Sequence, residues 1–233
     1  MNLTTTGIPG LDAQIGGFPL GSTILFLSEP CNATSIFAEQ FAAGGILKSE
    51  KVFYCSLERP AGEIRRNIGQ MESMSAEKAG AAEIIDMYSD GGRHHSGGKK
   101  AEKKSALGEI ERLVSAGRMK APYRFILESI STVLMESEQE GVISLIEKIA
   151  RSGRKSGGVN LILMTKNMHG IQMEYTAKHL ADGVLEIGLE RRGFGVYPYI
   201  MITKLRGIKE STKMLLYRET DKGLWLESTK RVF

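Results

Sequence analysis

The alternation of short apolar runs with segments of helical periodicity limits this chain to a few folds. The apolar runs have almost no polar interruptions, which is typical of strands buried on both faces of a parallel sheet. They are Thr23–Leu27, Val52–Leu57, Arg124–Leu127 and Asn160–Met164, with Glu83–Tyr88 as a further candidate. We therefore predict that these runs form a mostly parallel central sheet.

Segments with helical spacing separate the runs. Residues 33–47 place Ile36, Phe37 and Phe41 along one side, and 61–74, 105–117 and 139–155 are similarly amphipathic. Strand–helix–strand repetition predicts right-handed crossovers with helices on both faces of the sheet.

The pattern changes after Gly183, where strand-like runs follow one another with short turns between them. These runs are Val184–Leu189, Val196–Lys204, Lys213–Glu219 and Leu224–Glu227, and they predict an antiparallel extension of the sheet. No segment has the composition of an interdomain linker, and no internal repeat is visible. We expect a single α/β domain over residues 1–233.

Composition is typical of a soluble globular protein, with 42% hydrophobic and 25% charged residues. No apolar run approaches the length of about 18 residues that a membrane span needs. The N-terminal residues lack the basic and apolar regions of a signal peptide. Two cysteines, Cys31 and Cys55, form no disulfide framework. We predict a reduced, cytoplasmic protein without a membrane partner.

The net charge of +4 comes mainly from residues 89–105, which carry five lysines and arginines against two acidic residues, a local sum of +3. This Gly- and Ser-rich stretch has too few apolar residues to form a core, so we predict a flexible loop. Contact of the loop with a polyanion or an acidic partner stays open as an alternative. His94 and His95 have no companion ligands at metal-site spacing, so no metal site is predicted.

The turn after the first central strand is the first place to look for a ligand, because open parallel sheets bind ligands at the carboxyl ends of their strands. A phosphate-binding P-loop has the form Gly-x-x-x-x-Gly-Lys-Ser/Thr at this turn. Here the turn contains Ser28, Glu29, Pro30, Cys31, Asn32, Ala33, Thr34 and Ser35. Only Ser35 meets the motif; Ser28 and Ala33 replace the glycines and Thr34 replaces the lysine.

The flanking sequence resembles the KaiC-like family of RecA-superfamily ATPases. Gly7–Asp12 and Gly16–Ser22 are similar to the segment that precedes the P-loop in that family. Further similar segments are Ser56–Pro60, Glu63–Asn67, Ala181–Val184, Lys204–Gly207 and Glu219–Gly223. The matches run from residue 7 to about residue 225 and are weakest over 89–120. The resemblance implies a RecA-like P-loop NTPase fold with a degenerate Walker A motif.

The resemblance also implies roles for single residues. Glu58 matches the acidic position that orients the attacking water as a general base, but the second glutamate of many relatives is Arg59 here. Glu128 stands where the Walker B aspartate would face magnesium, and its longer side chain moves that charge. Lys204 and Arg206 match a basic pair that reaches a neighbouring subunit's γ-phosphate. The plainer alternatives are solvated strand ends for the two glutamates and surface charges for the basic pair.

The loop substitutions weaken phosphate binding in two ways. Loss of a lysine removes a charge pair worth about 4 kcal/mol at 4 Å and an effective dielectric constant near 20. Side chains at positions that need positive φ cost roughly 1–2 kcal/mol each. We therefore expect the loop to adopt another shape, with Asn32 capping a helix that begins at Ala33.

These observations favour a non-catalytic regulator or scaffold that binds other proteins and needs no cofactor. The first alternative is an ATP hydrolase that uses ATP and magnesium, with Glu58 as base and a lysine such as Lys166 compensating for the loop. The second is an accessory protein for single-stranded DNA, which is not favoured because Trp225 is the only tryptophan. A homo-oligomer, or a mixed ring with an active homologue, stays open.

Overall fold

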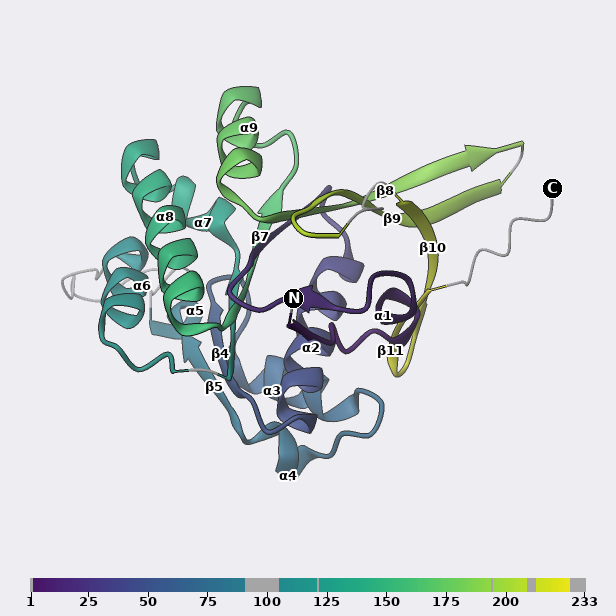
Figure 1. Ribbon diagram of the computed structural model, residues 1–233, viewed down its shortest axis with the longest axis horizontal. Coiled ribbons are helices and arrows are strands. Elements are labelled where there is room, and N and C mark those ends of the chain that lie inside the picture. The colour runs from purple at the N-terminus through teal and green to yellow at the C-terminus, as the bar shows by residue number, and fades with distance from the viewer. Residues whose placement is uncertain (1, 91–104, 121, 194, 209–212, 227–233) are drawn as a thin grey trace, which may run out of the picture.

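A computed structural model describes residues 2–90, 105–120, 122–193, 195–208 and 213–226 (Figure 1). Its main sheet has nine strands in the order β11-β10-β9-β8-β3-β7-β6-β4-β5. The parallel strands are β3 (Thr23–Ser28), β4 (Lys51–Ser56), β5 (Ala82–Asp86), β6 (Tyr123–Glu128), β7 (Val159–Thr165) and β8 (Gly183–Arg192). The antiparallel strands are β9 (Gly195–Leu205), β10 (Lys213–Thr220) and β11 (Gly223–Leu226).

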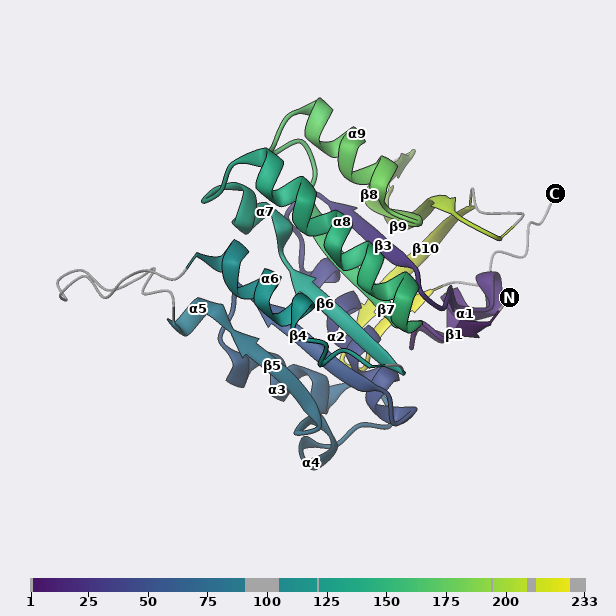
Figure 2. The same ribbon diagram turned by 60° about the vertical axis from the view of Figure 1, so that its left-hand side comes forward.

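Alternate residues of the central strands face two separate cores. In β3, Ile24 and Phe26 belong to one core and Leu25 and Leu27 to the other, as the pleat of a strand requires. Helices cover both faces (Figure 2). The first core is covered by α1 (Pro9–Ile15), α2 (Asn32–Leu47), α3 (Ala61–Gln70) and α4 (Ala76–Ala79), and the second by α6 (Ala106–Ser115), α7 (Ile130–Leu134), α8 (Gln139–Ser156) and α9 (Ile171–Leu180).

The predicted fold class is confirmed: a mostly parallel sheet carries helices on both faces and antiparallel strands at its C-terminal side. The predicted strand at Glu83–Tyr88 ends too late. The chain leaves β5 at Asp86 and forms the short helix α5 (Met87–Asp90). The Asp86 carboxylate stabilises this change of direction because it accepts hydrogen bonds from the backbone N–H and the hydroxyl group of Ser89. Residues 91–104 of the predicted loop lie outside the described residues, so its flexibility stays a prediction.

Hydrogen bonds of one buried arginine connect the N-terminal segment to the sheet. A small sheet of β1 (Leu3–Thr4) and β2 (Phe18–Pro19) precedes β3. The Arg124 guanidinium on β6 donates to Oγ1 of Thr4, to the carbonyl oxygen of Phe41 and to the Glu50 carboxylate. Gly45 leaves the space for it, since a Cβ there would lie 2.7 Å from Arg124 Cδ.

The hairpin of β8 and β9 extends away from the body of the molecule (Figure 1). Three apolar side chains near its tip, those of Leu189, Val196 and Tyr197, are 66%, 54% and 43% exposed. Among the described residues, no helix is long and apolar enough to cross a membrane.

Candidate functional site

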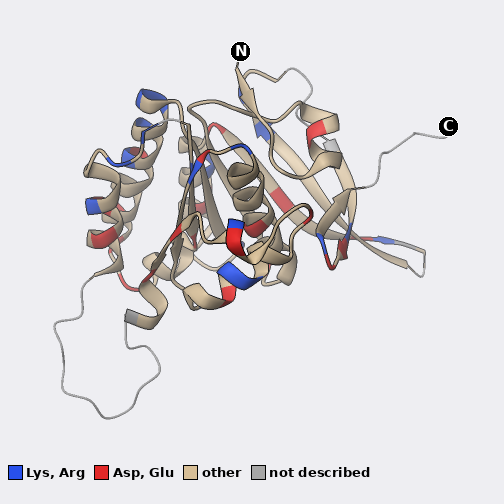
Figure 3. Ribbon diagram, turned by 90° about the horizontal axis from the view of Figure 1, so that it is seen from below, with Lys and Arg blue, Asp and Glu red and all other residues tan. Residues whose placement is uncertain are grey.

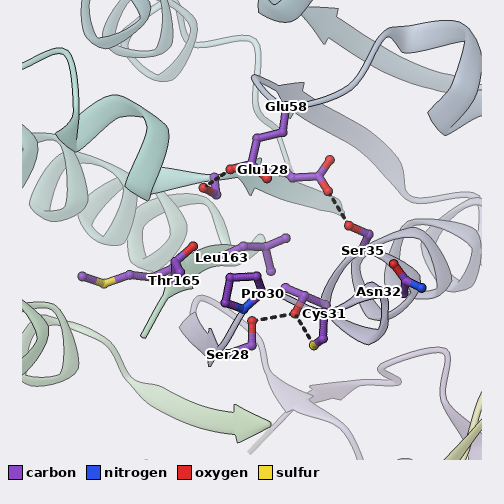
Figure 4. A pocket seen from close by; sticks show the side chains of 12 residues that line it. Ser28, Pro30, Cys31, Asn32, Ser35, Glu58, Glu128, Leu163 and Thr165 are labelled. Atoms are coloured by element: carbon purple, nitrogen blue, oxygen red, sulfur yellow. Dashed lines mark hydrogen bonds between the residues drawn. The ribbon is translucent and has the colours of Figure 1, made fainter. Parts of the chain in front are cut away.

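A cavity of about 400 Å³ lies where the parallel strands β3, β6 and β7 end, beside the start of α2 (Figure 4). Open parallel sheets bind their ligands at this edge, beyond the carboxyl ends of the strands. Its lining residues are Ser28, Pro30, Cys31, Asn32, Thr34, Ser35, Glu58, Glu128, Ser129, Leu163, Met164 and Thr165. The structure thus brings the predicted loop together with Glu58 and Glu128. Of the loop residues, exposed Glu29 and buried Ala33 do not line the cavity.

The loop between β3 and α2 is closed by its own hydroxyl groups. Oγ of Ser28 and Oγ1 of Thr34 lie 2.6 Å apart, and Sγ of Cys31 lies 3.4 Å from the same Thr34 oxygen. No residue from Ser28 to Ser35 has a positive φ. Thr34, which stands at the lysine position of the motif, therefore bonds within the loop.

The predicted cap by Asn32 is wrong. Helix α2 begins at Asn32 itself, the capping position belongs to Cys31 with an extended backbone, and no side chain accepts a hydrogen bond there. The asparagine side chain is exposed as a consequence of its place in the first turn. The amide groups of this helix end are thus not satisfied by a capping side chain.

An arginine–carboxylate cluster forms the wall behind the loop. The Arg59 guanidinium donates to both oxygens of Glu128, at 2.9 and 3.1 Å, and to Oε1 of Glu39 at 2.6 Å. The glutamate side chains are each 2% exposed and the arginine side chain is 19% exposed. Glu128 also accepts from Oγ of Ser35 and from the Tyr54 hydroxyl, both at 2.9 Å. Both carboxylate oxygens of Glu128 are therefore already engaged.

Burial and neighbouring charges both shift the pKa values of the groups in this cluster. Burial is the largest single influence on Arg59 and lowers its pKa, but the interactions with Glu128, Tyr54 and Glu39 together outweigh it, so the pKa is raised. Burial raises the pKa of Glu39, and the Arg59 charge only partly offsets it. The pKa of Tyr54 is raised well above its usual value by burial and then by the negative charge of Glu128. Arg59 therefore stays charged and Tyr54 stays protonated as a donor.

Glu58 and Glu128 have different surroundings, although both were predicted at strand ends. Glu128 is 1% exposed and ion-paired, so the alternative of a solvated strand end is wrong for it. Glu58 is exposed, and its Oε1 accepts from Oγ of Ser129 at 2.6 Å and from Oγ1 of Thr132 at 2.8 Å. Two hydroxyl groups from the segment after β6 thus orient the Glu58 carboxylate at the cavity.

Among the residues that the structure describes, the lining of the cavity contains two carboxylates and no lysine or arginine. Lys166, the residue considered as a substitute for the missing lysine, is not among the lining residues. Its Nζ donates to Glu186 on β8 at 2.8 Å. Among the described residues there is also no group of three or more His, Cys, Asp or Glu side chains that could hold a metal ion.

Lys204 and Arg206 make contacts within their own chain. Nζ of Lys204 donates to three backbone carbonyl oxygens at the end of α9, those of Lys178, His179 and Ala181, at 3.0, 3.2 and 2.6 Å. Arg206 pairs with Asp182 at 3.1 Å and its side chain is 65% exposed. Lys204 is therefore a cap of α9 rather than a plain surface charge, and a reach into a neighbouring subunit stays a prediction.

Sequence reasoning identified Arg59 only as a departure from the family pattern. No local sequence signal marks its role, because its two buried carboxylate partners lie 20 and 69 residues away in the chain. Its partner Glu39 lies in the middle of α2, and the sequence pattern does not distinguish it from a solvent-exposed polar residue of a helix. The structure shows that this face of α2 is buried.

Comparisons with known proteins agree on one family. The family model described as "ATPase: KaiC" matches residues 4–230. A UPF0273 protein of Aeropyrum pernix is 25% identical over 94% of this chain and 91% of its own length. Another from Methanopyrus kandleri is 23% identical over 97% and 92%.

A solved structure extends the comparison to the fold. The crystal structure of a KaiC-like protein from Pyrococcus horikoshii OT3 superposes with a TM-score of 0.73 at 23% identity, over 97% of this chain and 99% of that one. Over a shorter stretch, the circadian clock protein KaiC3 of Synechocystis is 39% identical across 27% of this chain and 13% of its own. The chain belongs to the KaiC family of ATPases and has its RecA-like α/β fold.

Proposed function

We propose that this chain is a non-catalytic member of its family, with a degenerate Walker A motif, that acts as a regulator or scaffold through contacts with other proteins. The observation that carries the proposal is the placement of the Arg59 guanidinium. It is bound to both oxygens of Glu128, at the position where an ATPase of this fold would direct a carboxylate at magnesium.

Magnesium does not fit the residues present. In P-loop enzymes the ion is held by the loop hydroxyl and an acidic residue at the end of a neighbouring strand. Here Ser35 donates that hydroxyl to Glu128, and Glu128 is paired with Arg59. A magnesium ion would have to displace a guanidinium that is fixed by Glu39 on its other side. No step through magnesium is therefore assigned to this chain.

A triphosphate is also disfavoured at the loop. The free amide groups at the start of α2 would favour an anion by about 0.3–1 kcal/mol. The missing lysine removes roughly 4 kcal/mol of attraction, and Glu58 adds a negative charge to the cavity wall. The lost attraction of the lysine and the repulsion by Glu58 together exceed the attraction of the helix amide groups, so we expect no tight binding of a triphosphate.

Exposed apolar side chains support a role in protein contacts. On α9, Ile171 and Tyr175 are 73% and 62% exposed and, four residues apart, they share one face of the helix. Leu189 on the β8–β9 hairpin is 66% exposed. Charged residues, in contrast, are mixed over the described chain, with lysines and arginines interspersed among acidic residues (Figure 3). That mixture gives no support to nucleic-acid binding, which needs a gathered basic surface.

Isothermal titration calorimetry with ATP and magnesium tests the proposal. We expect no binding at micromolar concentrations, while a family member with an intact P-loop, titrated in the same buffer, binds. Titration with ATP and EDTA separates binding of the nucleotide from binding of the metal. A micromolar Kd for this chain would overturn the proposal.

An ATP hydrolase is the second candidate because Glu58 is oriented at the cavity by Ser129 and Thr132, as a general base would have to be. If the chain hydrolyses ATP, Glu58→Gln abolishes the activity, measured as phosphate release. Unchanged turnover in this variant would reject Glu58 as the base.

A further inference from the structure

We infer that the cavity is a receptor for the cationic side chain of a partner protein, an arginine or a lysine, with Glu58 as its anchor. The inference rests on the proposed function, because a bound nucleotide would occupy the same space. It names the chemistry by which a protein partner would recognise this site.

Glu58 is a carboxylate that is already oriented for a ligand. Both of its hydrogen bonds, from Ser129 and Thr132, are to Oε1, and no side chain or backbone group among the described residues donates a hydrogen bond to Oε2. The side chain is exposed at the mouth of the cavity (Figure 4). Because the two hydroxyl groups fix the carboxylate before any partner arrives, less side-chain entropy is lost when a cation binds.

The charge around the cavity has the sign that attracts a cation. Four carboxylates, those of Glu39, Glu58, Glu63 and Glu128, share the neighbourhood of one guanidinium, that of Arg59, which contacts all of them except Glu58. Glu58 is therefore the carboxylate without a cationic partner among the described residues. The start of α2 contributes a partial positive charge of about half a unit, which is smaller than the full charge of Glu58.

The shape of the cavity suits a long side chain with a polar end. Its lining combines the apolar residues Pro30 and Leu163 with the hydroxyl groups of Ser129 and Thr165. Lysine and arginine have an apolar stem and a charged head, so the stem packs against the first set while the head pairs with Glu58. A divalent metal ion would need several oxygen ligands, and no metal-binding group of three occurs in the described residues.

NMR titration with N-acetyl-arginine methylamide and its lysine counterpart tests this inference on the full chain. We expect saturable shifts of amide signals around the cavity, at Thr34, Ser129 and Thr165, with millimolar affinity that weakens as salt is added. The neutral norleucine analogue, which has a similar stem and no charge, should leave these signals unchanged. Shifts spread over the surface, or none at the cavity, would overturn the inference.

Two variants isolate the anchor. Glu58→Gln should reduce the affinity for the arginine probe about tenfold or more, because the charge pair is lost. Glu29→Gln, an exposed glutamate of the same loop that does not line the cavity, should leave it unchanged. An equal affinity in Glu58→Gln and the unaltered chain would reject Glu58 as anchor. Thermal unfolding of both variants establishes that they are folded.

The same samples separate the two proposals. If ATP with magnesium binds and shifts the cavity signals, the proposed function fails. If neither ATP nor the cationic probes bind, the proposed function stands and only the cation receptor is rejected.

Discussion

Arg59 determines which further contacts Glu39 and Glu128 can make. It holds carboxylates from α2 and from the end of β6, and its Nη2 lies 3.4 Å from the hydroxyl of Tyr54 on β4. Such a buried pair need not stabilise a protein relative to an apolar replacement, but loss of one partner leaves the other charges buried without compensation. The arginine is therefore a structural requirement once Glu39 and Glu128 are present.

Replacement of Arg59 by methionine should lower the free energy of unfolding by about 3–5 kcal/mol, because two nearly buried carboxylates lose their counter-charge. Urea denaturation measures the loss. The matched control is Arg66→Met on the exposed side of α3, with an expected change of less than about 0.5 kcal/mol. The double variant Arg59→Met, Glu128→Gln should recover part of the loss; equal stability of Arg59→Met and the unaltered chain would contradict the account.

At the scale of elements, helix ends are tied by side chains from other parts of the sheet. Lys204 on β9 caps the end of α9, and Asp86 at the end of β5 accepts a hydrogen bond from the first amide of α3, that of Ala61, at 2.8 Å. Each of these contacts fixes one end of a helix and can be tested alone.

Lys204→Met should lower the free energy of unfolding by about 1–2 kcal/mol, because three carbonyl groups at the end of α9 lose their donor. Hydrogen exchange should become faster in the last turn of α9 and stay unchanged in α8. Arg206→Met serves for comparison; its exposed ion pair with Asp182 should contribute at most about 1 kcal/mol. Unaltered exchange in α9 of the Lys204 variant would show that the cap is dispensable.

Asp86 makes stability depend on pH. Burial raises the pKa of its carboxyl, but hydrogen bonds from Ala61 and Ser89 outweigh that effect and lower it below its ordinary value of 3.8. A lowered pKa means that the unfolded chain binds more protons, so the contribution is present above pH 3.8 and is lost as pH falls through the folded-state pKa. The stability difference between the chain and Asp86→Asn should therefore be constant near pH 6 and shrink below pH 3.8.

Denaturant titrations between pH 2.5 and 6 measure that difference. Asp221→Asn, at an exposed turn, provides the control and should show a difference that stays flat across the range. If the stability difference between the unaltered chain and Asp86→Asn grew as the pH fell, the folded state would raise the pKa of Asp86 rather than lower it.

The elements could be predicted from local sequence, and the contacts that define the site could not. The central strands are buried on both faces, so their apolar runs predict them directly; β3 is buried at every position. The end of β5 was missed because Asp86 bonds three residues ahead, which apolar pattern does not record. The partners of Arg59 lie 20 and 69 residues away, and no periodicity links positions so distant. The family resemblance placed Glu58 and Glu128 in the site, but their different partners required the fold.

At the scale of the whole molecule, one buried arginine joins the N-terminal segment, α2 and the central sheet. Arg124 is fully buried, pairs with Glu50 at 2.5 Å and stacks on the Phe41 ring at 4.5 Å. Burial lowers its pKa and the Glu50 charge partly restores it. Since Thr4 donates to the same Glu50 carboxylate, the N-terminal sheet depends on this pair for its position.

The effects of Arg124→Met should therefore extend from β6 to the N-terminal sheet. We expect a loss of about 3–5 kcal/mol in the free energy of unfolding, together with faster hydrogen exchange in β1 and β2 and earlier proteolysis in the N-terminal segment. The control Arg118→Met breaks an ion pair with Glu83 whose side chains are 56% and 42% exposed, so its cost should stay below about 1 kcal/mol.

Because Arg124 and Glu50 interact, Glu50→Gln combined with Arg124→Met should cost less than the sum of the two single changes. A strictly additive result, or a loss of stability without a change in the N-terminal segment, would mean that Arg124 holds only its local packing and that the N-terminal sheet is positioned by its apolar contacts alone.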